Sequence, residues 1–266
     1  MGTFLFYCLL FFIGLTLLGN LFTLVLQDFF IFRPEKLRPD YSFTFGAAYQ
    51  EIYISSVKGG KIHGLWFKNP KSSKGLVLYF HGNKGSVRRW GHLYHFFFRH
   101  GYDYFVCDYR GYGKSRGPRS ERTMYADAYA CFQWANQHYE KEQIVIFGRS
   151  IGSAFATRLA SQVVTKQLIL ETPFSSMRNL FYGYFPFLPR LFWFKYRFLN
   201  DHYFKDIQQP ITIFQGTNDL IVPYRIAAQL KPLLREKDAF FTIEQGTHHD
   251  LVFYDVYHIE MDRLLA

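Results

Sequence analysis

The first apolar pattern in the chain is a long, uninterrupted one. Residues 4–26 contain no charged side chain, and Asp28 is the first acidic or basic residue. A helix of this length is long enough to cross the hydrocarbon core of a membrane. A cleaved signal peptide and a buried core helix are the alternatives, but residues 1–3 carry no basic side chain and no small-residue cleavage site follows Leu26. The pattern therefore favours a transmembrane anchor over residues 1–32.

Further along, short apolar runs alternate with longer amphipathic stretches. From residue 76 onward this alternation predicts a mainly parallel sheet with helices on both faces. Two earlier runs flank a glycine-containing turn and predict a hairpin. We therefore expect one α/β domain over residues 33–266, with an eight-stranded sheet. The expected strands are 51–57, 61–67, 76–81, 102–108, 143–147, 167–171, 211–215 and 240–245, and the expected helices are 86–100, 120–139, 151–164, 224–236 and 250–265.

The strand expected at residues 143–147 ends in a sharp turn around a serine. Residues 148–152 read Gly-Arg-Ser-Ile-Gly, and a run rich in small residues follows. This G-x-S-x-G pattern between a strand and a helix is typical of a nucleophile elbow, in which the glycines leave room for a tight turn. The serine would lie at a helix N-terminus, where backbone N–H groups can hold a negative oxygen. Ser150 is therefore the predicted nucleophile.

A second G-x-S-x-G match, over residues 113–117, offers a competing serine, Ser115. Residues 110–112 separate it from the preceding strand, and Pro118 follows it where no apolar helix begins. The same stretch nearly matches a phosphate-binding loop, but Asp108 occupies the position of the first glycine. We therefore interpret this second match as a loop, and Ser115 as the weaker candidate.

A serine nucleophile needs a general base, and the base needs a group that orients it. In open α/β sheets, the active site lies at the carboxyl edge of the strands. Asp219 follows a strand that ends in Gly216, and it is the predicted acid. Its alternative role is that of an Asx-turn residue that only shapes the loop. Glu171, at the end of another strand, is the alternative acid.

The predicted base is one of two adjacent histidines that follow the last expected strand. His248 lies two residues beyond Gly246, in the free part of a loop. His249 adjoins Asp250, which resembles an N-cap of the final helix. We therefore expect His248 to be the base, with His249 as the alternative.

Six motifs lie in order between about residue 75 and residue 255. They are residues 81–85 (His-Gly-Asn-Lys-Gly), 108–115 (Asp-Tyr-Arg-Gly-Tyr-Gly-Lys-Ser), 148–152, 172–176 (Thr-Pro-Phe-Ser-Ser), Asp219 with Val222-Pro223, and 246–251 (Gly-Thr-His-His-Asp-Leu). In this order the motifs resemble those of the α/β hydrolases, and within that superfamily the chain is similar to the Bem46-like, membrane-anchored group. The resemblance implies an α/β-hydrolase fold.

The resemblance also implies where the oxyanion is held. In such hydrolases the residue after His-Gly donates a backbone N–H group, which here is that of Asn83, together with the N–H group of Ile151. It implies a structural role for His81, which holds the loop by hydrogen bonds. Lys84 and His249 stand where the group often has a small residue and an asparagine, and neither change removes a catalytic function.

An insert rich in aromatic residues, at about residues 175–206, separates two of the expected strands. Hydrolases of this fold commonly place a cap over the site at this point in the chain. Three interpretations stay open: a cap that only packs on the sheet, an acyl-binding pocket, or a surface that contacts lipid. In the last case Arg190, Lys195 and Arg197 would lie near the headgroups.

Charge and cysteine content argue against nucleic-acid binding and against a disulfide or metal framework. The formal net charge of +10 is spread thinly along the chain, and neither a clustered basic face nor a known nucleic-acid module is visible. Attraction to an anionic membrane surface explains the charge more simply. The 3 cysteines are scattered, and no His, Cys and carboxylate group has metal-ligand spacing, so we expect no disulfide framework, metal or other cofactor.

These observations predict a membrane-anchored serine hydrolase that cleaves an acyl ester or thioester of a small molecule, a lipid or an acylated protein. A peptidase of prolyl-oligopeptidase-like type and a non-catalytic membrane scaffold are the alternatives. Arg33, Lys36 and Arg38 flank only the C-terminal side of the apolar segment, so the positive-inside rule places the domain in the cytoplasm. The anchor is expected only to localise the enzyme.

Overall fold

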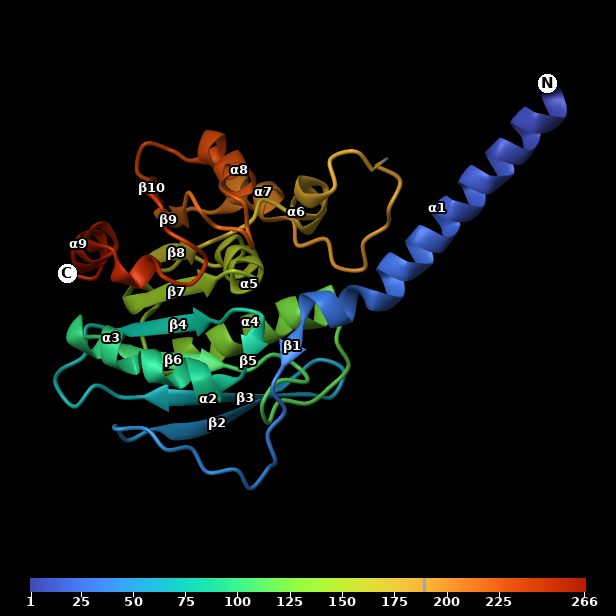
Figure 1. Ribbon diagram of the computed structural model, residues 1–266. Helices are drawn as coiled ribbons and strands as arrows, with labels where there is room; N and C mark the ends of the chain where they lie inside the picture. Colours follow the sequence, from blue (N-terminus) through green and yellow to red (C-terminus); the bar gives the residue numbers. More distant parts are fainter. Residues whose placement is uncertain (189) are drawn as a thin grey trace.

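The computed structural model describes residues 1–188 and 190–266, with the side chains of residues 22 and 23 left aside. Within this part of the chain, an eight-stranded sheet has the order β10-β9-β8-β7-β4-β6-β3-β2 (Figure 1). Neighbours from β10 to β6 run parallel, and β3 is antiparallel to both β6 and β2. The strands are β2 (Gln50–Ser56), β3 (Gly60–Phe67), β4 (Leu76–Phe80), β6 (Asp103–Cys107), β7 (Ile144–Arg149), β8 (Gln167–Glu171), β9 (Ile211–Gly216) and β10 (Ala239–Ile243).

The predicted α/β fold with a mainly parallel sheet is therefore confirmed, and each expected strand is present with its ends shifted by no more than a few residues. A short parallel pair was not expected. It joins β1 (Arg33–Pro34) to β5 (Lys84–Gly85), directly after the His81 motif. The pair ties the start of the globular domain to the loop that carries Asn83, whose carbonyl accepts a hydrogen bond from the Arg33 N–H at 3.0 Å.

Helices cover both faces of the sheet, and each face has its own apolar core. On one face, α4 (Glu121–Asn136) and α5 (Gly152–Ala160) bury side chains such as Cys131 and Phe155. On the other face, α3 (Tyr94–Arg99) and α9 (Asp255–Leu264) bury side chains such as Phe97 and Tyr257 (Figure 1). The central strands β4, β6, β7, β8 and β9 carry buried residues on both sides, which is why their sequences are largely continuous apolar runs.

Several expected helices are shorter or interrupted. The stretch expected at 250–265 begins with a 3₁₀ turn, η5, and only then becomes α9. The stretch expected at 224–236 is α-helical only in α8 (Tyr224–Ala227), and it continues as a 3₁₀ helix, η4 (Ala228–Leu233), which contains Pro232. The remaining elements are α2 (Val87–Trp90), η1 (Gly91–Leu93), η2 (Lys141–Gln143), α6 (Met177–Tyr184), α7 (Asn200–Tyr203), η3 (Phe204–Asp206), α8 (Tyr224–Ala227), η4 (Ala228–Leu233) and η5 (Leu251–Phe253).

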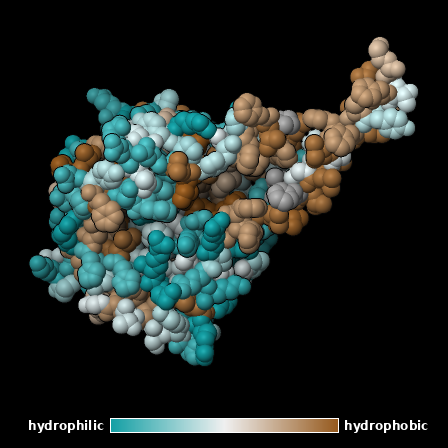
Figure 2. All heavy atoms as spheres, viewed as in Figure 1, coloured by the Kyte–Doolittle hydropathy of each residue, from teal (hydrophilic) through white to brown (hydrophobic). Residues whose placement is uncertain are grey.

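The N-terminal apolar segment forms one long helix, α1 (Gly2–Ile31), that projects away from the sheet domain (Figure 1). By length and composition, Gly2–Leu21 can cross a membrane. Most of its large apolar side chains are exposed, which excludes the interpretation of α1 as a core helix buried in the domain. Figure 2 shows this apolar surface continuing from α1 toward the body of the molecule.

Candidate active site

Ser150 occupies a strained turn between β7 and α5. Its φ is +53°, a left-handed value that residues with a side chain rarely adopt. The two glycines around it are required by close packing. A Cβ at Gly152 would lie 1.9 Å from the carbonyl oxygen of Phe80, and a Cβ at Gly148 would lie 2.6 Å from the Cβ of Ala156. The geometry is that of the strand-turn-helix expected from the G-x-S-x-G pattern.

Asp219 and His248 lie together at the ends of adjacent parallel strands, β9 and β10. The His248 Nδ1 atom is 2.7 Å from Asp219 Oδ2, and both side chains are nearly fully buried. The other oxygen, Asp219 Oδ1, accepts hydrogen bonds from the N–H groups of Ile221 at 2.8 Å and Val222 at 2.7 Å. These bonds fix the carboxylate, so Nδ1 of the imidazole carries its proton and Nε2 is left as the free acceptor.

The structure does not pair Ser150 with His248. In the described part of the chain, no hydrogen bond joins the serine hydroxyl to the imidazole, although Ser150 is only 8% exposed and His248 6%. Bonds of this kind commonly tighten only when substrate binds. A cavity of about 350 Å³ lies elsewhere, beside the C-terminal end of α1. Its described lining contains none of Ser150, Asp219 and His248.

The alternative base, His249, is exposed and its ring makes no hydrogen bond within the described residues. Its pKa is lowered, first by partial burial and then by the neighbouring His248. Asp250 stands at the N-cap position of η5, but its side chain makes no capping hydrogen bond there, unlike the N-cap that we expected of the final helix. Its carboxylate accepts from the Thr247 N–H at 2.6 Å, and α9 begins only at Asp255. Asp250 therefore closes a turn that holds the histidine loop.

The alternative acid, Glu171, is committed to other partners. Its carboxylate is 2.9 Å from Arg149 Nη1 and accepts from the Tyr257 hydroxyl at 3.0 Å. Arg149 in turn donates from Nη2 to the carbonyl oxygen of His248 at 3.0 Å. Glu171 thus acts on the histidine loop through Arg149 and has no contact with the imidazole of His248 among the described interactions. Sequence reasoning missed Arg149, which lies beside Ser150 and faces Glu171 across the register of β7 and β8.

Replacing Arg149 with methionine should destabilise the protein strongly. The substitution leaves the Glu171 carboxylate buried without its charged partner, a change that costs about 3–5 kcal/mol of unfolding free energy. Chemical denaturation of the wild type and the variant measures the difference. Tyr257→Phe is the matched control, because it removes only the second hydrogen bond to Glu171 and should cost about 1 kcal/mol. Equal losses in the two variants would contradict a structural role for the ion pair.

The loop after β4 approaches Ser150 closely. A Cβ at Gly82 would lie 3.9 Å from the Ser150 Cβ and 3.3 Å from the Trp90 ring. Asn83 follows at once, and its carbonyl also accepts from the Tyr112 hydroxyl at 2.7 Å. Within the described residues, the N–H groups of Asn83 and Ile151 donate to no other backbone group, so both stay available for an oxyanion.

His81 holds this loop, as expected. Its Nδ1 donates to the carbonyl oxygen of Gly82 at 2.7 Å, and its Nε2 lies 3.4 Å from Asp108 Oδ1. The His81 carbonyl accepts from the Tyr109 hydroxyl at 2.6 Å. The imidazole is fully buried and has no contact with Ser150 among the described interactions.

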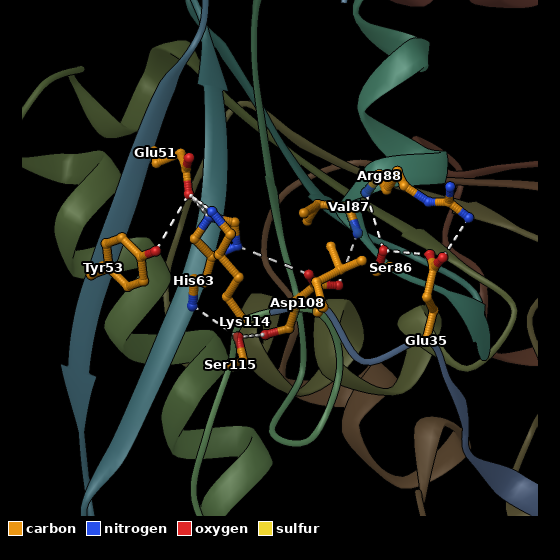
Figure 3. Close-up of polar contacts among 12 residues, drawn as sticks. Glu35, Glu51, Tyr53, His63, Ser86, Val87, Arg88, Asp108, Lys114 and Ser115 are labelled. Carbon is orange, nitrogen blue, oxygen red and sulfur yellow. Dashed lines mark hydrogen bonds and ion pairs between the residues drawn. The ribbon is translucent and has the colours of Figure 1, made fainter. Parts of the chain in front are cut away.

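Ser115, the competing serine, is part of a buried polar cluster on the β3 side of the sheet (Figure 3). Its hydroxyl donates to the Asp108 carbonyl at 2.8 Å and accepts from the His63 N–H at 2.8 Å. Figure 3 also shows Glu51 joined to His63 and to Lys114, at 2.9 Å and 2.6 Å. Both hydrogen-bonding functions of Ser115 are therefore used for structure, and the second G-x-S-x-G match builds a loop.

Comparison with known proteins identifies the family. The family model described as serine aminopeptidase, S33, matches residues 71–206. A lysophosphatidylserine lipase ABHD12 of Danio rerio is 32% identical in an alignment 219 positions long, which covers 71% of this chain and 57% of that protein. The Gallus gallus protein of the same name is 33% identical over 62% of this chain and 49% of its own length. The chain thus spans about half the length of the curated relatives it matches.

Solved structures agree on the fold. Esterase Pf2001 of Pyrococcus furiosus superposes with a TM-score of 0.68, at 19% identity, over 88% of this chain and 97% of the esterase. Acetyl xylan esterase 1 of a Thermoanaerobacterium species superposes with a TM-score of 0.65, at 16% identity, over 85% of each chain. The resemblance drawn from the six motifs is therefore confirmed at the level of the superfamily. This chain belongs to the serine aminopeptidase S33 family of α/β hydrolases.

Proposed function

We propose that the protein is a membrane-anchored serine hydrolase that cleaves acyl esters or thioesters through Ser150, His248 and Asp219. The observation that carries this proposal is the buried contact of 2.7 Å between Asp219 and His248, on the same sheet edge as the Ser150 elbow. A buried carboxylate that fixes one imidazole nitrogen prepares the other as a general base. The named lipases and esterases among the similar proteins support the same class of reaction.

The reaction follows from the roles of these groups. Ser150 Oγ attacks the acyl carbonyl while His248 Nε2 takes the hydroxyl proton. The N–H groups of Asn83 and Ile151 hold the oxyanion of the tetrahedral intermediate. His248 then gives its proton to the departing alcohol or thiol, which leaves an acyl-serine. Water, deprotonated by His248, attacks this ester and releases the acid, and the proton returns to Ser150.

An ester or thioester substrate fits the site better than a peptide with a free N-terminus. An aminopeptidase needs a carboxylate to bind the substrate ammonium group. Among the described residues, the buried carboxylates at the ends of β8 and β9 both have partners, Glu171 in Arg149 and Asp219 in His248. The apolar surface along α1 and the aromatic cap favour an acyl lipid (Figure 2).

The membrane part of the proposal rests on α1. Its apolar, largely exposed N-terminal part is long enough to span a bilayer, and exposed apolar surface of this extent marks a membrane or protein contact. Arg33, Lys36 and Arg38 follow the helix, so the positive-inside rule places the hydrolase domain on the cytoplasmic side.

A substrate panel tests the proposed reaction. We expect the full-length protein in detergent or vesicles to hydrolyse p-nitrophenyl esters and a lysophospholipid, and to prefer longer acyl chains. Aminoacyl and prolyl-peptide reporters should be cleaved at least about a hundred-fold less efficiently, measured as kcat/KM, because the buried carboxylates that the structure describes at this sheet edge, Asp219 and Glu171, already have partners. Preference for the peptide reporters would overturn the assignment in favour of the peptidase alternative.

A further inference from the structure

The C-terminal half of α1 carries polar side chains that an inert membrane tether would not need. Asn20 and Gln27 lie seven residues apart, which is two helical turns, and therefore share one face of the helix. Both are buried, at 4% and 8% exposure, although the large apolar side chains around them are mostly exposed. Asp28 adjoins them. Another segment of the same chain, residues 191–196, covers this polar face.

The polar face of α1 binds residues 191–196, the cap segment that lies beside it (Figure 1). Asn20 donates to the Leu191 carbonyl at 3.2 Å and accepts from the Trp193 N–H at 2.6 Å. Gln27 donates to the Trp193 carbonyl at 3.4 Å and accepts from the Tyr196 N–H at 3.1 Å. The two amides therefore satisfy the backbone of the cap segment as a neighbouring strand would.

Two further contacts close this interface. Asp28 forms an ion pair with Lys195 and accepts from the Tyr196 hydroxyl at 2.5 Å. At Gly19, the helix backbone and the cap approach so closely that a Cβ would lie 2.5 Å from the Phe192 ring. The interface thus combines hydrogen bonds, one ion pair and a glycine that admits an aromatic ring.

Contacts link the cap segment, on its side away from α1, to the loop that carries Asp219, the candidate catalytic acid. Phe192 and Phe194 pack against Phe181 of α6, with ring centroids 5.8 Å and 5.4 Å apart. At the end of α6, the Tyr184 hydroxyl lies 2.6 Å from each of the carbonyl oxygens of Leu220 and Ile221, which share its one proton as acceptors.

The last step of this path reaches Asp219 itself. The N–H of Ile221 is one of the two backbone groups that donate to Asp219 Oδ1. The pKa of Tyr184 is raised, first by burial and then by the charge of Asp219, which places its hydroxyl in the field of the carboxylate. Packed side chains and hydrogen bonds therefore run without a gap from α1 to the acid loop.

We propose that Asn20 and Gln27 are positioning residues that fix the cap between the membrane surface and the active site, and that this placement sets the preference for acyl lipids held in a bilayer. The proposal rests on the proposed function. The apolar stretch Gly2–Leu21, at about 1.5 Å per residue, spans a bilayer of about 30 Å, so the polar face emerges at the surface. A cap held there places its aromatic side chains between the lipid surface and the loop of Asp219.

The test uses two variants of the full-length protein in vesicles, each with a matched control. Asn20→Leu combined with Gln27→Leu removes the amides and keeps α1 apolar. Its control is Thr16→Val, because the Thr16 hydroxyl bonds only to the Phe12 carbonyl of the same helix, at 2.8 Å. Gly19→Leu pushes the Phe192 ring away. Its control is Gly14→Leu, because a Cβ at Gly14 meets nothing within 4 Å.

The first measurement is limited trypsin cleavage after Lys195 and Arg197, which reports the cap without any need for activity. We expect cleavage to be faster by about ten-fold or more in both test variants, because a segment that loses its contacts opens locally more often. The controls should match the wild type. Unchanged cleavage in Asn20→Leu/Gln27→Leu and in Gly19→Leu would overturn the claim that α1 holds the cap.

The second measurement compares kcat/KM for a long-chain lysophospholipid in the vesicles with that for p-nitrophenyl acetate in water. In both test variants, kcat/KM should fall about ten-fold for the lipid and less than about two-fold for the acetate. A ten-fold effect is typical of residues that act on a site through a chain of contacts. Equal losses on both substrates would overturn the assignment of lipid preference to the cap. A wild type inactive on both substrates would refute the proposed function, and the cleavage result would still decide whether α1 holds the cap.

Discussion

Replacing Ser150 with alanine should abolish covalent labelling by a fluorophosphonate probe and lower kcat for a p-nitrophenyl ester by about four to six powers of ten. The reason is geometric. Ser150 is the serine held at φ +53° between β7 and α5, close to the loop whose N–H groups are available for an oxyanion. Without its hydroxyl, no acyl-enzyme forms, and only weak stabilisation by the N–H groups remains. Mass spectrometry of the labelled wild type locates the modified residue.

Ser115→Ala is the matched control, because it removes a serine hydroxyl from the other G-x-S-x-G sequence. This variant should keep its label and its kcat. It should lose about 1–3 kcal/mol of unfolding free energy, since the Asp108 carbonyl and the His63 N–H would lose their buried partner. Label on Ser115, or none on correctly folded wild type, would show that Ser150 is not the nucleophile.

The choice between these two serines shows how far the sequence could lead. Both have the same local pattern, and only the flanking residues distinguish them: an apolar strand before Gly148, and Pro118 after the other match. The strands of the sheet were predictable for a related reason. The central strands β4, β6, β7, β8 and β9 are buried almost throughout, so their apolar runs are continuous and hard to mistake for an amphipathic helix. The edge strands β2 and β10 are only partly buried.

Features that depend on contacts between distant segments could not be predicted in the same way. The pair of β1 and β5 is two residues long on each side, too short for a periodic pattern. The part played by Arg149 depends on the register that places it opposite Glu171. The order of residues within one strand does not reveal how it aligns with its neighbour. The ion pair of Arg149 with Glu171 was therefore not predicted, and Glu171 was assigned only as an alternative acid.

The contact between α1 and the cap had a signal in the sequence. Two amides at positions 20 and 27 interrupt an otherwise apolar helix at a spacing of two turns. Buried polar groups need partners, so such a face indicates a contact with another segment. We expected α1 only to localise the enzyme. That expectation stays untested. The contacts of Asn20, Gln27 and Asp28 show in addition that α1 packs against residues 191–196.

The two adjacent histidines should differ sharply in their effect on catalysis. His248→Ala should lower kcat by about three powers of ten or more, because it removes the group that takes the serine proton. His248 is the imidazole whose Nδ1 lies 2.7 Å from Asp219, whereas His249 is exposed and its ring is hydrogen bonded to nothing among the described residues. His249→Asn should therefore keep kcat within about ten-fold of the wild type, a size typical of residues near a site but outside its chemistry.

Asp219→Asn separates the role of the carboxylate from that of the ring. It should lower kcat by about four powers of ten, because the amide favours the wrong tautomer of His248. The pH profile adds a second distinction. Burial and the neighbouring His248 lower the pKa of His249. The acidic limb of the kcat/KM profile reports the group that takes the serine proton, so His249→Asn should keep that limb. The opposite result would be a large loss of kcat in His249→Asn and an active His248→Ala, with both proteins shown to be folded by circular dichroism. It would mean that His249, and not His248, is the base.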